Sequence, residues 1–170
     1  EAEMNWQATD KLNVRAGIAL NSTEFTSFTK QNIYTENGGL PTITTGDGSE
    51  FFILDSMESP FSPDITANLG LSYEIDLGAS GNIVPGVFIY HSGDYQTNSV
   101  PYFWANQDAY TTVDFSATWY SPSDQITVQM YVNNATDEEV ITGSDTFSGS
   151  RAVVDFNNPR VWGVRVAYNF

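Results

Sequence analysis

The sequence predicts an all-β fold made of antiparallel, up-and-down transmembrane β-barrel strands. Two observations lead to this prediction. Apolar and polar residues alternate with a period of two over about seven segments of the chain, which is typical of strands whose two faces meet different environments. The connections between these segments are short and long in turn, as in outer-membrane barrels with tight turns on one side of the bilayer and long loops on the other.

The alternation is cleanest over residues 65–77, where odd positions are apolar and even positions are polar or glycine. It is least regular over residues 83–91, because apolar residues occupy both odd and even positions there, among them Val87 and Phe88. The cleanest segments have the roughly 9–11 residues, or slightly more, that a tilted strand needs to cross the apolar layer. In chain order, the predicted strands are residues 2–8, 12–20, 65–77, 83–91, 109–119, 126–132 and 160–170.

Charged residues test the alternation independently, because an unpaired charge that faces hydrocarbon is costly. Glu24 and Arg160 fall on the nominal apolar face, but each lies at a strand end, where a long side chain reaches water. The other strand charges fall on the polar face. By this alternation, the residues that face the lumen of a barrel include Arg15, Glu74, Asp76, Asp114 and Arg165.

Loop length and aromatic placement agree with a membrane barrel. The short links are residues 9–11, 78–82 and 121–124, and the long ones are residues 26–64, 93–108 and 135–159. Aromatic residues gather near both ends of the strands, where outer-membrane barrels carry interfacial girdles. The expected girdles comprise Trp6, Tyr73, Trp119, Tyr120, Tyr168 and Phe170 at the turn end, and Phe25, Tyr90, Tyr110 and Trp162 at the loop end.

Composition excludes several other classes. Six basic residues stand against 21 acidic ones, and a net charge of -15 argues against nucleic acid as a partner. Without cysteine there is no disulfide framework and no thiolate site. No stretch of some twenty apolar residues predicts a transmembrane helix. The first residues lack the pattern of a signal peptide, so we expect any export signal outside this sequence.

The last predicted strand carries a family resemblance. Residues 160–170 resemble the terminal strand of outer-membrane proteins, which ends in an aromatic residue and is read by the barrel-assembly machinery; the matching positions are Trp162, Val164, Val166, Tyr168 and Phe170. Residues 132–140 (VNNATDEEV) and 158–163 (NPRVWG) resemble the end of TonB-dependent receptors. Members of that family often have an Asn-Leu-Thr-Asp-Glu-Glu-Tyr type of segment, from which this chain departs at Ala135 and Val140.

The resemblance implies a plugged barrel of about twenty-two strands in the bacterial outer membrane. Such a receptor imports a scarce nutrient (siderophore-bound iron, cobalamin or a glycan) and is driven by the TonB energy-transducing complex. About seven strands do not close a barrel of that size, and open sheet edges are not tolerated in hydrocarbon. We therefore expect residues 1–170 to be the C-terminal segment of a longer receptor, in contact with lipid, the rest of the barrel and the plug, with the plug domain absent from this sequence.

Two groups of residues are candidates for contact with cargo or plug. The aromatic run Tyr102, Phe103 and Trp104 in the second long loop could stack on a cargo or anchor the outer interface. Arg15 and Arg165 could hold an anionic cargo or the plug. We favour the alternative in which both arginines form ion pairs with lumen carboxylates such as Glu74, Asp76 or Asp114.

We predict no metal site and no cofactor. His91 is the single histidine and is expected to be a solvated residue at the rim. The acidic run of residues 137–139 is expected to be a solvated turn. Residues 46–50 (GDGSE) lack the full pattern of a calcium loop.

No catalytic constellation is visible, because the strand carboxylates have no histidine beside them, so we expect no enzymatic activity. Two alternatives to a receptor segment stay open. One is a complete eight-stranded barrel with a structural or adhesion role, if residues 51–54 form a further strand. The other is a soluble carbohydrate-binding β-sandwich, in which the apolar strand faces meet each other rather than lipid.

Overall fold

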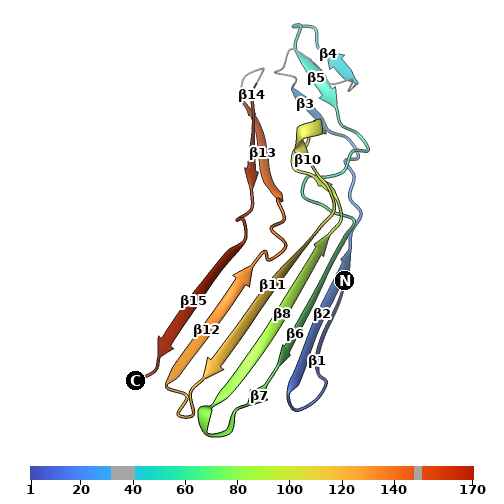
Figure 1. Cartoon of the computed structure of the whole chain (residues 1–170). Coiled ribbons are helices and arrows are strands. Elements are labelled where there is room, and N and C mark those ends of the chain that lie inside the picture. Colours follow the sequence, from blue (N-terminus) through green and yellow to red (C-terminus); the bar gives the residue numbers. More distant parts are fainter. Residues whose placement is uncertain (32–40, 148–150) are drawn as a thin grey trace.

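The centre of the protein is one curved antiparallel sheet, seen in a computed structural model that describes residues 1–31, 41–147 and 151–170 (Figure 1). Each strand pairs with the preceding and the following strand of the sheet, as an up-and-down meander requires. The strand order is β1 (Ala2–Gln7), β2 (Leu12–Leu20), β6 (Ile65–Tyr73), β8 (Asn82–Ser92), β11 (Tyr110–Tyr120), β12 (Ile126–Asn133) and β15 (Val161–Tyr168). The seven predicted strands and their antiparallel order are therefore confirmed.

The strand predicted over residues 65–77 is interrupted once, at Glu74. β7 (Ile75–Asp76) continues β6 in the same register along β8, since Ser72 lies opposite Gly86 and Ile75 lies opposite Ile83. The interruption thus faces Val84 and Pro85. Proline has no N–H to donate to the ladder, so the hydrogen bonds between the strands are lost at this point.

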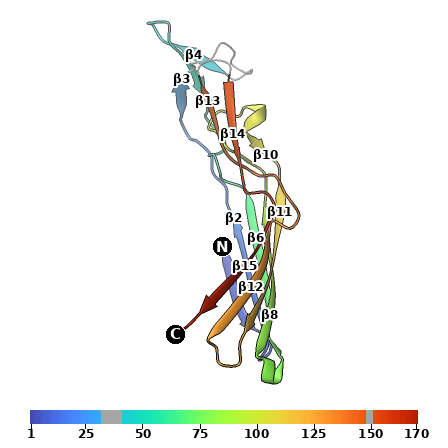
Figure 2. The same cartoon turned by 60° about the vertical axis from the view of Figure 1, so that its left-hand side comes forward.

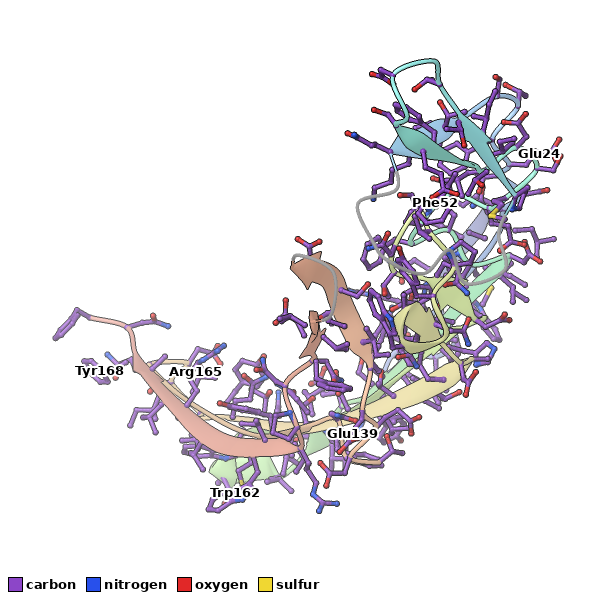
Figure 3. All side chains as sticks on the ribbon, turned by 90° about the horizontal axis from the view of Figure 1, so that it is seen from above. Glu24, Phe52, Glu139, Trp162, Arg165 and Tyr168 are labelled. Carbon is purple, nitrogen blue, oxygen red and sulfur yellow. The ribbon has the colours of Figure 1, made fainter. Side chains whose placement is uncertain are left out.

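The register places apolar residues of neighbouring strands side by side on the convex face. Leu71 of β6 lies between Val14 of β2 and Val87 of β8, and the same order continues across the sheet to β15. Nothing in the described part of the chain covers this face, and Trp162 is 78% exposed. Figure 3 shows Trp162 and Arg165 on opposite sides of β15, with Arg165 on the concave side. The sheet thus has an exposed apolar face and a polar one.

The register also shows which residues of the irregular segment 83–91 lie on each face of the sheet. Ile83, Val87 and Ile89 lie on the apolar face, whereas Phe88 and Tyr90 lie on the polar face opposite Asp114 and Thr112. The girdle prediction is therefore wrong for the three tyrosines that occupy concave positions, which are Tyr90, Tyr110 and Tyr120. For Tyr90 the physical reason is that alternation alone does not fix a face where both sets of positions are apolar. Tyr110 and Tyr120 share the even, polar positions of Thr112, Asp114, Ser116 and Thr118, so nearness to a strand end does not put them on the lipid-facing side.

All long loops lie at one end of the sheet and all short turns at the other (Figures 1 and 2). The loops contain a small sheet of β3 (Thr29–Gln31), β5 (Glu50–Ile53) and β4 (Thr42–Thr44), the pair β9 (Tyr95–Gln96) and β10 (Asn106–Gln107), the short 3-10 helix η2 (Phe103–Ala105), and the hairpin β13 (Ile141–Phe147) and β14 (Arg151–Phe156). At the turn end, η1 (Gly78–Ser80) forms part of the link between β7 and β8.

The loops, and not the sheet, hold the buried apolar core of the described residues. Phe52 and Leu54 from the first long loop pack with Val100 from the second, and all three are fully buried. Phe28, Met57 and Tyr102 pack around them. The first two long loops therefore form one structured layer beyond the end of the sheet.

Two alternatives are wrong in the light of this arrangement. A strand does form at residues 50–53, but it pairs with β3 and β4 in a separate small sheet. It does not join the central sheet as a further strand, so it does not complete a small barrel. A sandwich is also excluded as the arrangement of the described residues, because no second sheet packs on the apolar face.

β1 and β15 form the two edges of the central sheet, far apart in Figure 1, and the described residues do not close a barrel. Within the described residues, no helix is long and apolar enough to cross a membrane.

Candidate functional site

An open groove of about 610 Å³ runs over the middle of the concave face. Its walls come from five neighbouring strands and from β15 at the edge. Amides, hydroxyls and two guanidinium groups dominate the lining, with Gly70 and Gly86 leaving room for larger neighbours. The polar side chains of the groove are those of Asn13, Arg15, Asn68, Ser72, Asp114, Ser116, Gln129, Tyr131, Asn133 and Arg165.

The concave carboxylates are engaged locally. Glu74 accepts a hydrogen bond from the amide of Asn82 (3.0 Å), and Asp76 accepts one from the backbone N–H of Gly78 (2.7 Å). Asp114 accepts one from the backbone N–H of Asn134 (2.7 Å). Each carboxylate thus stabilises a neighbouring turn or strand, and none pairs with an arginine in the described residues.

The expected ion pairs of Arg15 and Arg165 are therefore not formed. The register explains why. Arg15 lies opposite Gly70, four residues from Glu74, which separates them by about 13 Å along the strand direction. Arg165 lies opposite Gln129, which is itself opposite Thr118, and Asp114 is four residues away. Both arginines and all three carboxylates do share the concave face, as the alternation predicts.

Asp114 also connects the groove to the third long loop. The Asn134 that it binds is buried and has a positive φ of 50°, a conformation that asparagine tolerates better than most residues. The Asn134 side chain donates to the carbonyl of Glu138 (2.8 Å) and to that of Asn158 (3.2 Å), and accepts from the N–H of Glu138 (2.9 Å). This asparagine therefore ties β12 to the entry of β15.

A second set of contacts completes this junction, which we define as residues 134–140 and 157–160. Asp137 accepts a hydrogen bond from the N–H of Arg160 (2.8 Å), and its carboxylate lies 3.6 Å from the Arg160 guanidinium. Asn157 donates to the carbonyl of Glu138 and accepts from the N–H of Val140 (3.1 and 3.0 Å). The motif quoted for the family resemblance is therefore a hydrogen-bonded turn, and within the acidic run Asp137 has a structural role. The sequence did not predict that the side chains of Asn134 and Asn157 hold this junction together.

We expect Asn134→Ala to destabilise the junction by about 2 kcal/mol, because it leaves buried backbone groups without partners. Hydrogen exchange of residues 134–160 in the folded full-length protein measures this loss as faster exchange. Asn134→Gly separates the causes, since glycine accepts the positive φ but makes none of the hydrogen bonds. If the glycine variant exchanges as slowly as the unsubstituted protein, the side-chain bonds do not hold the junction.

Aromatic residues gather at the loop end of the concave face. Tyr110 lies 6.1 Å from Tyr90 and 6.5 Å from Tyr95 between ring centroids, and Phe61 lies 5.8 Å from Tyr95. The Tyr95 hydroxyl donates to the carbonyl of Ile141 (3.1 Å), which attaches the hairpin β13–β14 to the second loop. Burial raises the pKa of Tyr95, so its phenol stays protonated and able to donate this bond.

The candidate cargo residues lie in the loop layer. Tyr102 and Trp104 stack with ring centroids 4.8 Å apart, and Tyr102 also packs against the buried core of Phe52, Leu54 and Val100. Part of this aromatic run therefore supports the loop layer. The side chain of Phe103 lies outside the described residues.

The remaining loop candidates have local partners. The ring of His91 is hydrogen-bonded to the Thr111 hydroxyl (2.9 Å) at the loop end of β8. Asp47 accepts hydrogen bonds from the Thr45 hydroxyl and the Ser49 N–H, which lower the pKa of its carboxyl. Among the residues that the structure describes, no group of three or more acidic or histidine side chains is arranged to hold a metal ion.

No protein-family model and no curated protein matches the sequence. Solved structures do match its fold. One is the ferric yersiniabactin uptake receptor FyuA from Yersinia pestis, with a TM-score of 0.68 and 19% identity over 99% of this chain. Another is the siderophore receptor PiuA from Acinetobacter baumannii, with a TM-score of 0.65 and 16% identity over 96% of this chain. The chain has the β-barrel fold of these receptors.

The match is to part of each receptor barrel. This chain spans 22% of FyuA, 20% of PiuA and 36% of BauA, the ferric preacinetobactin receptor from Acinetobacter baumannii, to which it is similar with a TM-score of 0.56 and 14% identity. The structural neighbours are transport receptors and not enzymes. At the level of fold, the resemblance to TonB-dependent receptors is therefore confirmed, and the sheet matches part of the fold of these receptors.

Proposed function

We propose that this chain forms one sector of the wall of a TonB-dependent outer-membrane receptor that imports a scarce nutrient. One observation carries the proposal: a single sheet exposes an apolar convex face and a polar concave face. An apolar face of this size left open to water would be an aggregation hazard, whereas against lipid it is favourable. In a closed barrel the concave face would line the interior, and the structured loop layer would lie outside the cell.

The cargo that we propose is a siderophore-bound metal, because PiuA is a siderophore receptor by name and FyuA is a ferric yersiniabactin uptake receptor. Cobalamin and glycans are the competing cargo classes. The plug and the residues that contact the energy-transducing complex would belong to other parts of the polypeptide. We place the chain in the C-terminal part of the barrel, because its last strand has the alternation and aromatic end expected of a terminal strand.

The proposal predicts a native polypeptide much heavier than 18.8 kDa in the outer-membrane fraction. Cell fractionation, followed by immunoblotting with an antibody raised against residues 1–170, measures both size and location. An inner-membrane marker and a periplasmic marker serve as controls. A band at 18.8 kDa, or a band outside the outer membrane, would contradict the proposal.

Cargo is tested separately by growth under iron limitation. A strain that lacks the native gene is expected to lose growth on one ferric siderophore as the iron source and to regain it when the gene is restored. Growth on free ferrous iron is the control, because it does not require a siderophore receptor. Undiminished growth on every ferric siderophore, together with loss of growth on cobalamin or a glycan, would replace the cargo class while keeping the transport function.

A further inference from the structure

An open apolar groove of about 510 Å³ lies on the convex face, close to the edge strand β15. The aromatic side chains of Phe115 on β11 and Trp162 on β15 stand on either side of Val132. In the next row, Ala117 contributes only a methyl group, which leaves space beside its larger neighbours. The apolar side chains that line the groove are those of Phe115, Ala117, Met130, Val132, Trp162 and Val164.

A cation lies at the loop end of this groove. Continued by one residue, the alternation of β15 places Arg160 on the side of Trp162, about 7 Å along the strand direction. The Arg160 side chain is half-exposed; its Nη1 donates to the carbonyl of Ala135 (3.3 Å), and its Nη2 lies 3.6 Å from the Asp137 carboxylate. A guanidinium has five N–H groups, so Arg160 keeps donors without a partner among the described residues.

A second cavity, of about 300 Å³, lies next to Arg160 and is acidic. Its lining includes Asp137, the ion-pair partner of Arg160, together with Glu138 and Glu139. The carboxylates of Glu138 and Glu139 have no partner among the residues that the structure describes. The exposed ring of Phe156 also lines this cavity and offers an aromatic face to a cation.

Charge decides which ligand fits these three neighbouring features. A purely anionic head group would meet one guanidinium beside three carboxylates, so repulsion would offset much of the attraction. A head group that carries a phosphate and an ammonium group would meet the opposite charge at both positions. The apolar groove is complementary to an acyl chain, which gains free energy by leaving water. Together these features are complementary to a zwitterionic phospholipid.

We propose that the convex face holds one lipid of the phosphatidylethanolamine type at this place. An acyl chain occupies the apolar groove beside Trp162, the phosphate contacts Arg160, and the ammonium group lies beside Glu138 and Glu139. The inference rests on the proposed function, because it takes the convex face as the lipid-facing side of a barrel wall. It adds a selective lipid site to a face that otherwise contacts lipid without selection.

Native mass spectrometry of the full-length protein, extracted from the outer membrane in detergent, tests the inference. Phosphatidylethanolamine, phosphatidylglycerol and phosphatidylcholine with the same acyl chains are added separately. We expect the phosphatidylethanolamine adduct to be at least about threefold stronger than either of the others. Phosphatidylglycerol lacks the ammonium group, and the quaternary ammonium of phosphatidylcholine has no N–H to donate.

Variants in the groove test the acyl-chain contact. Ala117→Phe fills the groove and is expected to lower the phosphatidylethanolamine adduct by about threefold or more. Ala16→Phe is the matched control, because Ala16 lies on the convex face of β2, opposite Leu69 and far from the groove. This control is expected to keep the adduct unchanged.

Charge variants test the head-group contacts. Arg160→Gln is expected to lower the phosphatidylethanolamine adduct by about threefold or more, whereas Arg160→Lys keeps most of it. Asp137→Asn removes the same ion pair but leaves the guanidinium, so it controls for loosening of the junction and is expected to keep the adduct. The Glu138→Gln, Glu139→Gln double variant is expected to bring phosphatidylglycerol close to phosphatidylethanolamine. Only variants that reach the outer membrane in folded, heat-modifiable form are compared.

Three outcomes overturn the inference. These are adducts of equal strength for the three lipids, a stronger adduct with phosphatidylglycerol than with phosphatidylethanolamine, and a phosphatidylethanolamine adduct that neither Ala117→Phe nor Arg160→Gln lowers. Each leaves the proposed function intact if the protein fractionates with the outer membrane. Absence of the protein from the outer membrane would instead contradict the proposed function itself.

Discussion

Ala117→Arg is expected to reduce the stability of the folded protein in a bilayer by about 2–4 kcal/mol, because it places a guanidinium in the lipid-facing apolar band. Ala117 lies in the middle of β11 on the convex face, opposite Met130 of β12 and Pro85 of β8. Folding of the full-length polypeptide into lipid vesicles, followed as a function of urea concentration, measures the change.

The neighbouring residue provides the matched control for this prediction. Thr118 lies one position along the same strand on the concave face, opposite Gln129. Thr118→Arg introduces the same charge and length, but on the polar side, so we expect a loss below about 1 kcal/mol. Equal losses for the two variants would show that the convex face does not meet hydrocarbon.

The second large effect is expected at the turn between β7 and β8. Gly81 has a φ of 86° and a ψ of -151°, a conformation that is open almost only to glycine. A Cβ atom there would overlap the backbone carbonyl oxygen of Tyr120, which cannot move without shifting the end of β11. We therefore expect Gly81→Ala to destabilise the protein by about 3 kcal/mol, measured in the same vesicle-folding experiment.

Gly78 in the same turn is the control that separates the cost of a positive φ from the cost of a steric clash. Its φ is also positive, at 61°, but a Cβ atom built on it meets nothing within 4 Å. Gly78→Ala should therefore cost only the backbone strain, about 1 kcal/mol. If the two alanine variants lose the same stability, the close approach of Gly81 to Tyr120 is not what fixes this turn.

The junction around Asn134 links the groove to the third long loop. Asp114 both lines the groove and accepts the Asn134 N–H, so one carboxylate belongs to the groove and to the junction that leads to the hairpin β13–β14. The hairpin is further attached to the second loop through Tyr95, and through Gln107, which accepts from the N–H of Ile141 (2.6 Å). The third long loop is therefore attached to the central sheet through Asp114 and to the second long loop through Tyr95 and Gln107.

The sequence by itself determined the number and order of the strands in the central sheet and the face of most of their residues. It did so because the two faces of a membrane sheet meet different solvents, and this difference is written into the chain with a period of two. The concave placement of Arg15 and Arg165, and the exposed apolar positions from Leu71 to Trp162, follow from that period alone. The separation of short turns from long loops follows from the lengths of the links between the alternating segments.

Only the tertiary structure decided what depends on residues far apart in the sequence. It placed Phe88 and Tyr90 on the polar face through their register with β6 and β11, which the local pattern could not fix. It also joined Phe52 to Val100 in the loop core, and Asp114 to Asn134 in the junction. The two arginines stayed free of lumen carboxylates because strand register, and not charge, sets which side chains meet on a sheet.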